Sequence, residues 1–367
     1  MMKKKIMIAF GTRPEAIKVV PVIKELLANT HLFELKIIVS GQHQEMLYQI
    51  LDQYDIVPHL DLNVMKTGQS LNELTSRILT GMQLALQTYQ PDIVLVHGDT
   101  TTALATALAC FYEQIKIGHI EAGLRTYHPY NPFPEEMNRQ LISKLAHYHF
   151  APTAHNVSNL AYEGITDNVY VTGNTAIDTL LLNTSLTYSD PYLSKRRNKN
   201  FILLTTHRRE NLGTAMTDIF SAVRQLAIDF PTYDFVYPMH LNPEIRRLAL
   251  DILSDQSNIH LIEPLDVLAF HHYIQHSFMV LTDSGGIQEE APAVGKPVLV
   301  LRETSERSEG VAAGTLALVG TATKDIYHAV HRLITDEAHY QQMAQSINPY
   351  GDGTASQKII RVLASEL

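Results

Sequence analysis

The chain of 367 residues is longer than one hydrophobic core usually supports, so its length predicts two domains. Hydrophobic residues make up 45% of the sequence and charged residues only 18%, a balance that favours sheets covered on both faces. The net charge of −9 argues against nucleic acid or an anionic membrane as a partner, but it allows a small phosphorylated ligand held by a few cations.

The chain carries one cysteine, Cys110, within an apolar stretch, which predicts a buried thiol in a reducing compartment. Lysines 3–5 and the apolar run 6–10 resemble the start of a signal peptide, but that run is too short for one. No apolar run is long enough to span a bilayer. We therefore expect a cytoplasmic protein.

Strand and helix patterns alternate through the first half of the chain. Strands are predicted at residues 6–10, 35–39, 93–96, 115–120, 149–152 and 169–172. Helices are predicted at about residues 15–27 and 71–88, in segments ending at residues 51 and 112, and from residue 135 onward. Such repeated βα units with short connections predict a parallel, doubly wound sheet.

A polar segment, residues 183–200, is interpreted as surface structure near a domain boundary. The second half repeats the pattern, with strands expected at residues 201–205, 235–237, 259–262, 278–281 and 297–301, and an amphipathic helix at 355–367. We therefore expect an α/β fold of two Rossmann-like doubly wound parallel-sheet domains with a central cleft. The expected bounds are residues 1–173 and 174–350, followed by a C-terminal helical segment at 351–367.

Chemically reactive side chains follow the predicted strands, where doubly wound domains bind ligands. In the second half, the turn Asp283-Ser284-Gly285-Gly286 leads from a strand into a helix and offers backbone N–H groups to a phosphate. Glu290, one turn later, suits sugar hydroxyls. The alternative is a glycine turn without a ligand.

Three carboxylates of the first half, Asp99, Glu121 and Glu135, occupy strand ends or a helix start. Clustered carboxylates shift one another's pKa values, so that one acts as base while another acts as acid. The alternatives are an N-cap for Asp99 and a first-turn charge for Glu135. Arg13 and Lys18 could clamp an anion at a helix start, or remain solvated charges.

Histidines also mark the second half. His207, in a loop rich in charge, and His240 follow strands and suit phosphate binding. His271, His272 and His276 could include a zinc pair, but with no cysteine or nearby acidic ligand a solvated helix face is expected instead. The sequence has no Walker lysine turn, no Gly-x-Gly-x-x-Gly and no Gly-x-Ser-x-Gly, which argues against an NTPase, a dehydrogenase and a serine hydrolase.

A series of motifs identifies a resemblance to a known family. GTRPEAIK, GQH, HGDTT, HIEAGLRT, PFPEEMNRQ, HFAPT, VTGN, THRREN, HLNP and TDSGGIQEEAP occur in this order. The chain thereby resembles bacterial UDP-N-acetylglucosamine 2-epimerase of the non-hydrolysing type. The resemblance implies a glycosyltransferase-B fold, a homodimer, a C-terminal helix that crosses back to the first domain, and no cofactor or metal.

The resemblance also implies an activity: reversible epimerisation at C2 of UDP-N-acetylglucosamine, by elimination of UDP and its re-addition, for cell-surface polysaccharide synthesis. The implied catalytic residues are Asp99, Glu121, Glu135 and His207. The implied UDP-sugar contacts are Arg13, Lys18, His240, Ser284, Gly285, Gly286 and Glu290. Gln42, His43 and Arg77 match a regulatory site for a second UDP-N-acetylglucosamine, the expected activator.

Two related activities stay open. A hydrolysing epimerase would release N-acetylmannosamine and UDP, and a glycosyltransferase of the same fold would pass the sugar to an acceptor. The residue that acts as the C2 base is also open.

Overall fold

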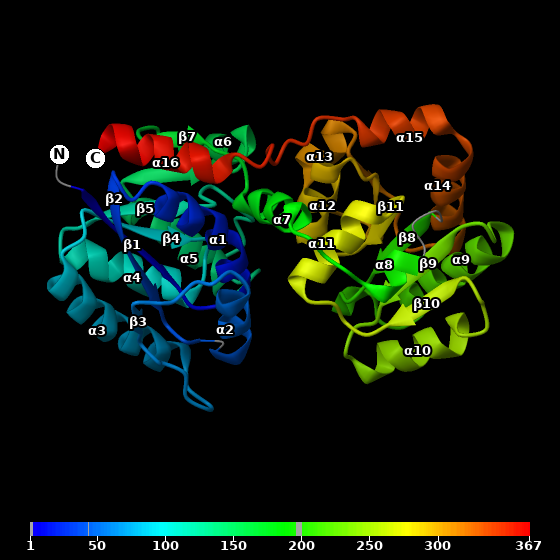
Figure 1. Ribbon diagram of the computed structural model, residues 1–367, viewed down its shortest axis with the longest axis horizontal. Helices are drawn as coiled ribbons and strands as arrows, with labels where there is room; N and C mark the ends of the chain where they lie inside the picture. The colour runs from blue at the N-terminus through cyan, green and yellow to red at the C-terminus, as the bar shows by residue number, and fades with distance from the viewer. Residues whose placement is uncertain (1–2, 43, 196–199) are drawn as a thin grey trace. The chain divides into compact units, whose positions relative to one another are not determined.

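The computed structural model describes residues 3–42, 44–195 and 200–367. The chain divides into two compact units, each built on one parallel sheet (Figure 1). Unit 1 comprises Met1–Thr179 and Gly351–Leu367, and unit 2 comprises Leu180–Tyr350. The predicted α/β fold with two doubly wound parallel sheets is confirmed.

Unit 1 contains a seven-stranded sheet. Its strands are β1 (Lys4–Phe10), β2 (Phe33–Val39), β3 (Leu60–Asp61), β4 (Ile93–His97), β5 (Lys116–Ile120), β6 (Tyr148–Ala151) and β7 (Val169–Val171), in the order β3-β2-β1-β4-β5-β6-β7. Its helices are α1 (Arg13–Ala28), α2 (Gln44–Gln53), α3 (Leu71–Tyr89), α4 (Thr101–Tyr112), α5 (Glu135–Leu145), α6 (Ala154–Tyr162) and α16 (Ala355–Glu366). Helix α7 (Thr175–Ser185) runs from unit 1 into unit 2.

Unit 2 contains a six-stranded sheet. Its strands are β8 (Phe201–Thr205), β9 (Asp234–Pro238), β10 (Ile259–Ile262), β11 (Met279–Thr282), β12 (Val298–Val300) and β13 (Leu316–Leu318), in the order β10-β9-β8-β11-β12-β13. Its helices are α8 (Pro191–Lys195), α9 (Thr214–Asp229), α10 (Pro243–Leu253), α11 (Val267–His276), α12 (Gly285–Glu290), α13 (Ser308–Ala313), α14 (Thr323–Thr335) and α15 (Glu337–Ala344), with short 3-10 helices η1 (Arg209–Asn211) and η2 (Ala291–Val294).

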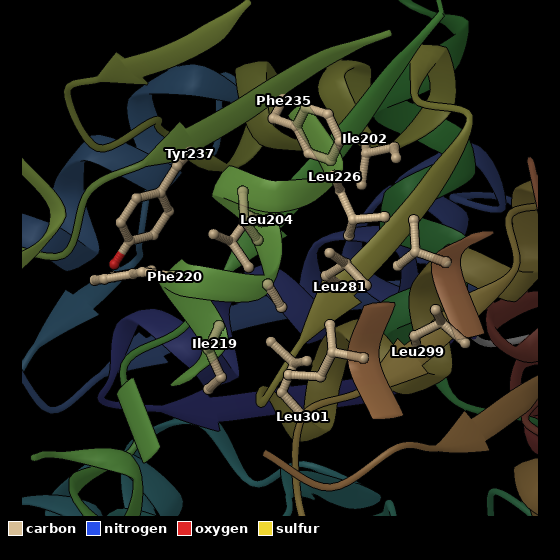
Figure 2. Packing of buried hydrophobic residues seen from close by; sticks show 14 of the residues in the cluster. Ile202, Leu204, Ile219, Phe220, Leu226, Phe235, Tyr237, Leu281, Leu299 and Leu301 are labelled. Carbon is tan, nitrogen blue, oxygen red and sulfur yellow. The ribbon is translucent and has the colours of Figure 1, made fainter. Parts of the chain in front are cut away.

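The sheet of unit 2 is buried on both faces, as its nearly continuous apolar strands predict. In β8, Ile202 and Leu204 join one apolar cluster while Phe201 and Leu203 join the cluster on the other face. Figure 2 shows the first cluster, in which Ile202 and Leu204 lie near side chains of α9 such as Phe220 and Leu226. Burial on both faces leaves the ends of the strands as the places where polar chemistry can reach solvent.

Helix α16 belongs to unit 1, where it packs against α1. Its N-terminus is capped by a side chain from another helix: the carboxylate of Asp178, in α7, accepts hydrogen bonds from the backbone N–H groups of Ala355 (3.2 Å) and Ser356 (2.7 Å). It also accepts one from the Ser356 hydroxyl (2.5 Å). Thr354, at the N-cap position itself, makes no side-chain cap.

The interpretation of residues 183–200 as surface structure is wrong for its beginning. Helix α7 continues to Ser185, and Asn183 is fully buried. Strands β3 and β13 were not predicted, whereas the predicted burial of Cys110 is confirmed. Among the described residues, no helix combines the length and the apolar character needed to cross a bilayer.

Candidate active site

A cavity of about 460 Å³ opens in unit 1 at the carboxyl ends of β1, β4 and β5. This one cavity is lined by the three carboxylates singled out from the sequence, Asp99, Glu121 and Glu135, and also by Lys18 and Gln42. The remaining lining residues are Thr12, Pro14, Glu15, Leu71, His97, Gly98, Thr100, Thr101, Pro134 and Asn138.

The wall beside β1 is built by a capping box at the start of α1. The buried carboxylate of Glu15 accepts hydrogen bonds from the backbone N–H (2.9 Å) and hydroxyl (2.8 Å) of Thr12 and from the Thr100 hydroxyl (2.7 Å). Burial raises the pKa of Glu15, although these hydrogen bonds oppose the rise. Glu15 therefore ties the first helix to the loop that carries Asp99, a role that its position in the sequence did not reveal.

Glu121 occupies an unusual backbone conformation directly after β5, with φ at 64°. Left-handed backbone is disfavoured for a residue with a side chain and recurs at functional sites. The carboxylate is held in place: its Oε1 lies 2.5 Å from Lys18 Nζ and 3.2 Å from Asn174 Nδ2, and its Oε2 lies 3.8 Å from His97 Nε2. Burial lowers the pKa of His97 to about 4, so that this imidazole is neutral near pH 7.

Asp99 faces the same cavity and pairs with Arg139, whose Nη2 lies 3.0 Å from Asp99 Oδ2. Burial raises the pKa of Asp99 to about 6; Arg139 opposes this shift, and Glu121 adds to it. The alternative that Asp99 is an N-cap is wrong, because the Thr100 side chain caps α4 and accepts from Ala103 N–H at 3.0 Å. Asp99 thus has no part in capping the helix that follows it.

Glu135 is the first residue of α5 and lines the cavity. Its neighbour Glu136 is buried and accepts hydrogen bonds from the backbone N–H groups of Thr126 and Tyr127 and from Gln140. Burial alone would raise the pKa of Glu136, but these bonds and Arg139 outweigh it and lower that pKa. Because Arg139 Nε lies 3.6 Å from Glu136 Oε2, the guanidinium that pairs with Asp99 is itself anchored.

Sequence reasoning missed Arg139 and Asn174 as members of the site. Arg139 is spaced three residues from Glu136 and four from Glu135, so helical periodicity alone could have placed the three side chains on one face. Asn174 follows β7 in the VTGN motif, and no local pattern relates it to Glu121, which is 53 residues away.

In unit 2, the residues singled out gather around Asp283, directly after β11. The Asp283 carboxylate is buried and accepts hydrogen bonds from the backbone N–H groups of His207 (3.0 Å) and Arg208 (2.9 Å), from the Thr206 hydroxyl (2.9 Å) and from Asn211 Nδ2 (3.0 Å). Burial would raise its pKa, but the bonds from His207 and Arg208 outweigh it and hold the pKa below its usual value.

Asp283 also orients the ring of His207, whose Nδ1 lies 3.2 Å from Asp283 Oδ1. The rings of His207 and His240 stack at 6.0 Å between centroids. Of the predicted turn, Ser284 is the N-cap of α12, and Gly285 and Gly286 are already the first two residues of that helix. A Cβ on Gly285 would lie 3.1 Å from the Arg307 guanidinium, so glycine keeps this cation close to the turn.

Glu290 ends α12, with Oε2 at 3.5 Å from His271 Nε2. The expected solvated face is wrong for His271 and His272, which are both buried, whereas His276 is exposed as expected. His271 instead packs between Glu290 and Asn183, and His272 stacks on Tyr188.

Three further residues were singled out from the sequence: Arg13 and Arg77 are not part of these two groups, and His43 is not among the described residues. Arg13 begins α1 but is not in the described lining of the unit 1 cavity. The Arg77 guanidinium donates hydrogen bonds to Val64 O and Gln69 Oε1. His43 lies outside the described residues.

Comparison with known proteins places the whole chain in one family. A family profile for UDP-N-acetylglucosamine 2-epimerase matches residues 25–364. Curated proteins named UDP-N-acetylglucosamine 2-epimerase share 50% identity over 364 residues in Bacillus subtilis, covering 99% of this chain and 96% of the relative, and 48% over 375 residues in Campylobacter jejuni, covering 99% and 98%. The crystal structure of UDP-GlcNAc 2-epimerase from Neisseria meningitidis bound to UDP-GlcNAc matches with a TM-score of 0.85 and 47% identity, covering 99% of this chain and 100% of that one. The chain therefore belongs to the UDP-N-acetylglucosamine 2-epimerase family.

Proposed function

We propose that this chain catalyses the reversible epimerisation of UDP-N-acetylglucosamine at C2 to UDP-N-acetylmannosamine, without hydrolysis. The observation that carries the proposal is that Asp99, Glu121 and Glu135 line one and the same cavity in unit 1. The pKa of Asp99, raised by burial to about 6, suits a group that accepts a proton in one direction of the reaction and donates one in the other near neutral pH.

The carboxylates are needed because the hydrogen at C2 of the sugar is only weakly acidic. C2 of the sugar has no neighbouring carbonyl to acidify its hydrogen, so a base alone would not remove it. When the C1–O bond breaks, its electron pair leaves with UDP, positive charge builds at C1, and the C2 proton passes to a carboxylate to give 2-acetamidoglucal. In the reverse sense, a proton is added to the opposite face of C2 while the UDP oxygen attacks C1. Nearby anionic groups stabilise the cationic transition state in both directions.

Inversion requires one group to remove the proton and another to deliver it from the opposite face. We assign Asp99 to one of these transfers because its protonated and ionised forms are both accessible, and Glu121 or Glu135 to the other. Lys18 and Asn174, both on Glu121 Oε1, hold that carboxylate in a fixed orientation. Such fixed orientation lowers the reorganisation needed during the reaction.

The nucleotide is assigned to residues of unit 2, together with Arg13 and Lys18. His207 faces Asp283 with Nδ1, which leaves Nε2 to donate to a phosphate oxygen as UDP departs. His240 and the turn of Ser284, Gly285 and Gly286 would hold the diphosphate, and Glu290 the ribose. Charge-assisted hydrogen bonds of this kind would retain UDP during the lifetime of the glucal.

We further propose a second UDP-N-acetylglucosamine site at Gln42, His43 and Arg77, through which the substrate activates the enzyme. Gln42 supports this idea because it lines the catalytic cavity and its Oε1 accepts a hydrogen bond from Thr102 (3.2 Å). We also propose that the enzyme is a homodimer, that it is cytoplasmic, and that its product supplies cell-surface polysaccharide synthesis.

The test is incubation with UDP-N-acetylglucosamine in D2O, followed by NMR of the products. We expect UDP-N-acetylmannosamine with deuterium at C2, because the proton delivered to the new face comes from solvent. Oxygen-18 in the C1–O–P bridge should scramble into non-bridging phosphate positions. UDP-sugar product without deuterium at C2 would overturn the mechanism. Free N-acetylmannosamine with UDP would indicate a hydrolysing epimerase, and sugar transfer to an acceptor without C2 exchange would indicate a glycosyltransferase.

A further inference from the structure

Behind Glu290 lies a buried histidine that the proposed chemistry does not use. His271, in α11, is 2% exposed, and its Nε2 lies 3.5 Å from Glu290 Oε2. On the other side of the ring, Nδ1 lies 2.9 Å from the side-chain Nδ2 of Asn183, which is 0% exposed. The imidazole of His271 thus lies between the Asn183 amide on one side and the Glu290 carboxylate, at the end of α12, on the other.

The contact with Asn183 fixes which nitrogen of His271 carries hydrogen. An amide nitrogen only donates, so Nδ1 of His271 must accept. In the neutral ring the hydrogen then resides on Nε2, the atom that faces Glu290. Asn183 thus sets the tautomer in which His271 offers an N–H to the carboxylate.

The two oxygens of Glu290 have different surroundings. Oε2 faces His271, whereas Oε1 lies on the side of the turn, where a Cβ on Gly286 would approach it to 3.5 Å. The Glu290 side chain is 17% exposed, so the carboxylate reaches solvent only in part. One oxygen faces the buried histidine, while the other is presented beside the turn assigned to the nucleotide.

We propose that His271, held by Asn183, is a positioning residue that orients Glu290 to accept hydrogen bonds from the ribose hydroxyls, and thereby makes the site discriminate ribonucleotides from deoxyribonucleotides. This inference rests on the proposed function, which puts the ribose at Glu290. A site built to bond a hydroxyl rejects an analogue that lacks it, because its own polar group is left without a partner. The discrimination depends on orientation, since a carboxylate that swings away loses this bond.

The test compares the affinity for UDP with that for 2′,3′-dideoxy-UDP by calorimetry. For the unaltered enzyme we expect UDP to bind at least about tenfold more tightly, as for a hydrogen bond to a charged group. In His271→Leu the affinity for UDP should fall about tenfold while that for the dideoxy analogue changes less than about twofold, so that the ratio approaches one. Asn183→Ala leaves the His271 ring in place but removes the amide that contacts it, and should also lower the ratio.

Steady-state kinetics provides a second measurement. KM should rise in both variants with little change in kcat, because the carboxylates assigned to the chemistry lie in unit 1.

His272→Leu is the matched control. His272 neighbours His271 on α11 and is also buried, but it stacks on Tyr188, with ring centroids 4.6 Å apart, and its contact with Asn183 is to the backbone rather than to the side-chain amide. This variant should keep the ratio of the unaltered enzyme even if it loses some stability.

Glu290→Ala distinguishes a failure of the positioning role of His271 from a failure of the proposed nucleotide site. If Glu290→Ala abolishes the discrimination while folded His271→Leu and Asn183→Ala both retain it, the positioning role is overturned and the nucleotide assignment stands. If Glu290→Ala itself retains the discrimination, the ribose does not bind at Glu290, and the nucleotide assignment fails with it. In the double variant His271→Leu/Glu290→Ala, we expect no further loss beyond that of Glu290→Ala.

Discussion

In unit 1, Glu121 is held in a backbone conformation that residues with a side chain seldom adopt. Glu121 combines a left-handed backbone with contacts to Lys18 and Asn174; nearby Gly98 also has positive φ, which glycine adopts without strain. A Cβ on Gly98 would lie 3.4 Å from Glu121 Oε2. Backbone strain of this kind costs of order 1–3 kcal/mol and persists where the surrounding contacts over-determine it. The position of the Glu121 carboxylate therefore depends on the surrounding contacts as well as on Glu121 itself.

Each carboxylate of the cavity can be tested by removing its charge with little change of shape. We expect Asp99→Asn, Glu121→Gln and Glu135→Gln each to lower turnover by at least about 10² while UDP still binds. Steady-state kinetics and calorimetry measure the two effects separately. Asp251→Asn, an exposed carboxylate of α10, is the control and should leave turnover unchanged. A cavity variant with near-normal turnover would remove that residue from the mechanism.

Arg139 provides a test of Asp99 through pH. Burial raises the pKa of Asp99 to about 6, and Arg139 works against that rise. If ionised Asp99 takes the proton, turnover falls as pH drops through about 6. Arg139→Met removes the opposing charge, so the pKa of Asp99 should rise further and the acidic limb of the kcat profile should move to higher pH. Arg139→Lys keeps the charge and should move the limb less; an unmoved limb in folded Arg139→Met would argue against Asp99 as the titrating group.

At the scale of elements, the start of α16 depends on a side chain that is distant in sequence. Asp178→Ala leaves the N–H groups of Ala355 and Ser356 without their acceptor, and we expect a loss of about 2 kcal/mol in the free energy of unfolding. Urea denaturation measures this loss. Thr354→Ala is the matched control, because Thr354 stands at the N-cap position without capping, and it should cost less than about 0.5 kcal/mol. Equal losses would mean that Asp178 does not cap the helix.

Elements with a strong apolar pattern could be predicted from the sequence, and those without one could not. β8 is apolar along nearly its whole length and was predicted with its observed bounds, whereas β3 and β13 have two and three residues, too few to show a period. Asn183 was assigned to the surface because of its polarity, while its buried partner His271 lies 88 residues away.

The same limit applies to the candidate site. Carboxylates at strand ends could be predicted, since the ends of parallel strands meet at one edge. Asp99 and Thr100 are both residues that cap helices well, however, and only the folded chain shows that Thr100 does so. The contact between Arg139 and Asp99 likewise depends on the packing of α5 beside α4, which no local pattern specifies.

At the scale of the whole molecule, we expect a homodimer that uses the face formed by α3 and α4. These helices pack together and present Leu84, Phe111 and Tyr112, each exposed over more than half of its surface. Leu84→Glu with Tyr112→Glu should weaken dimerisation by at least about 10², because charges would have to be buried. Light scattering after size exclusion measures this change. Ile347→Glu, at an exposed apolar residue of unit 2, should leave the mass unchanged; a dimer that survives the double substitution would place the interface elsewhere.

The return of α16 to unit 1 sets the order in which the molecule can be completed during synthesis. Unit 2 is one continuous segment and can fold once Tyr350 has emerged, whereas unit 1 must wait for Ala355–Glu366 although most of it was made first. At roughly 5–20 residues per second, the ribosome spends on the order of ten seconds on unit 2. Throughout that time the nascent unit 1 lacks the helix that packs on α1, so the apolar surface that α16 covers stays exposed. A premature stop just before residue 355 would therefore leave the later-made unit whole and the earlier-made one unfinished.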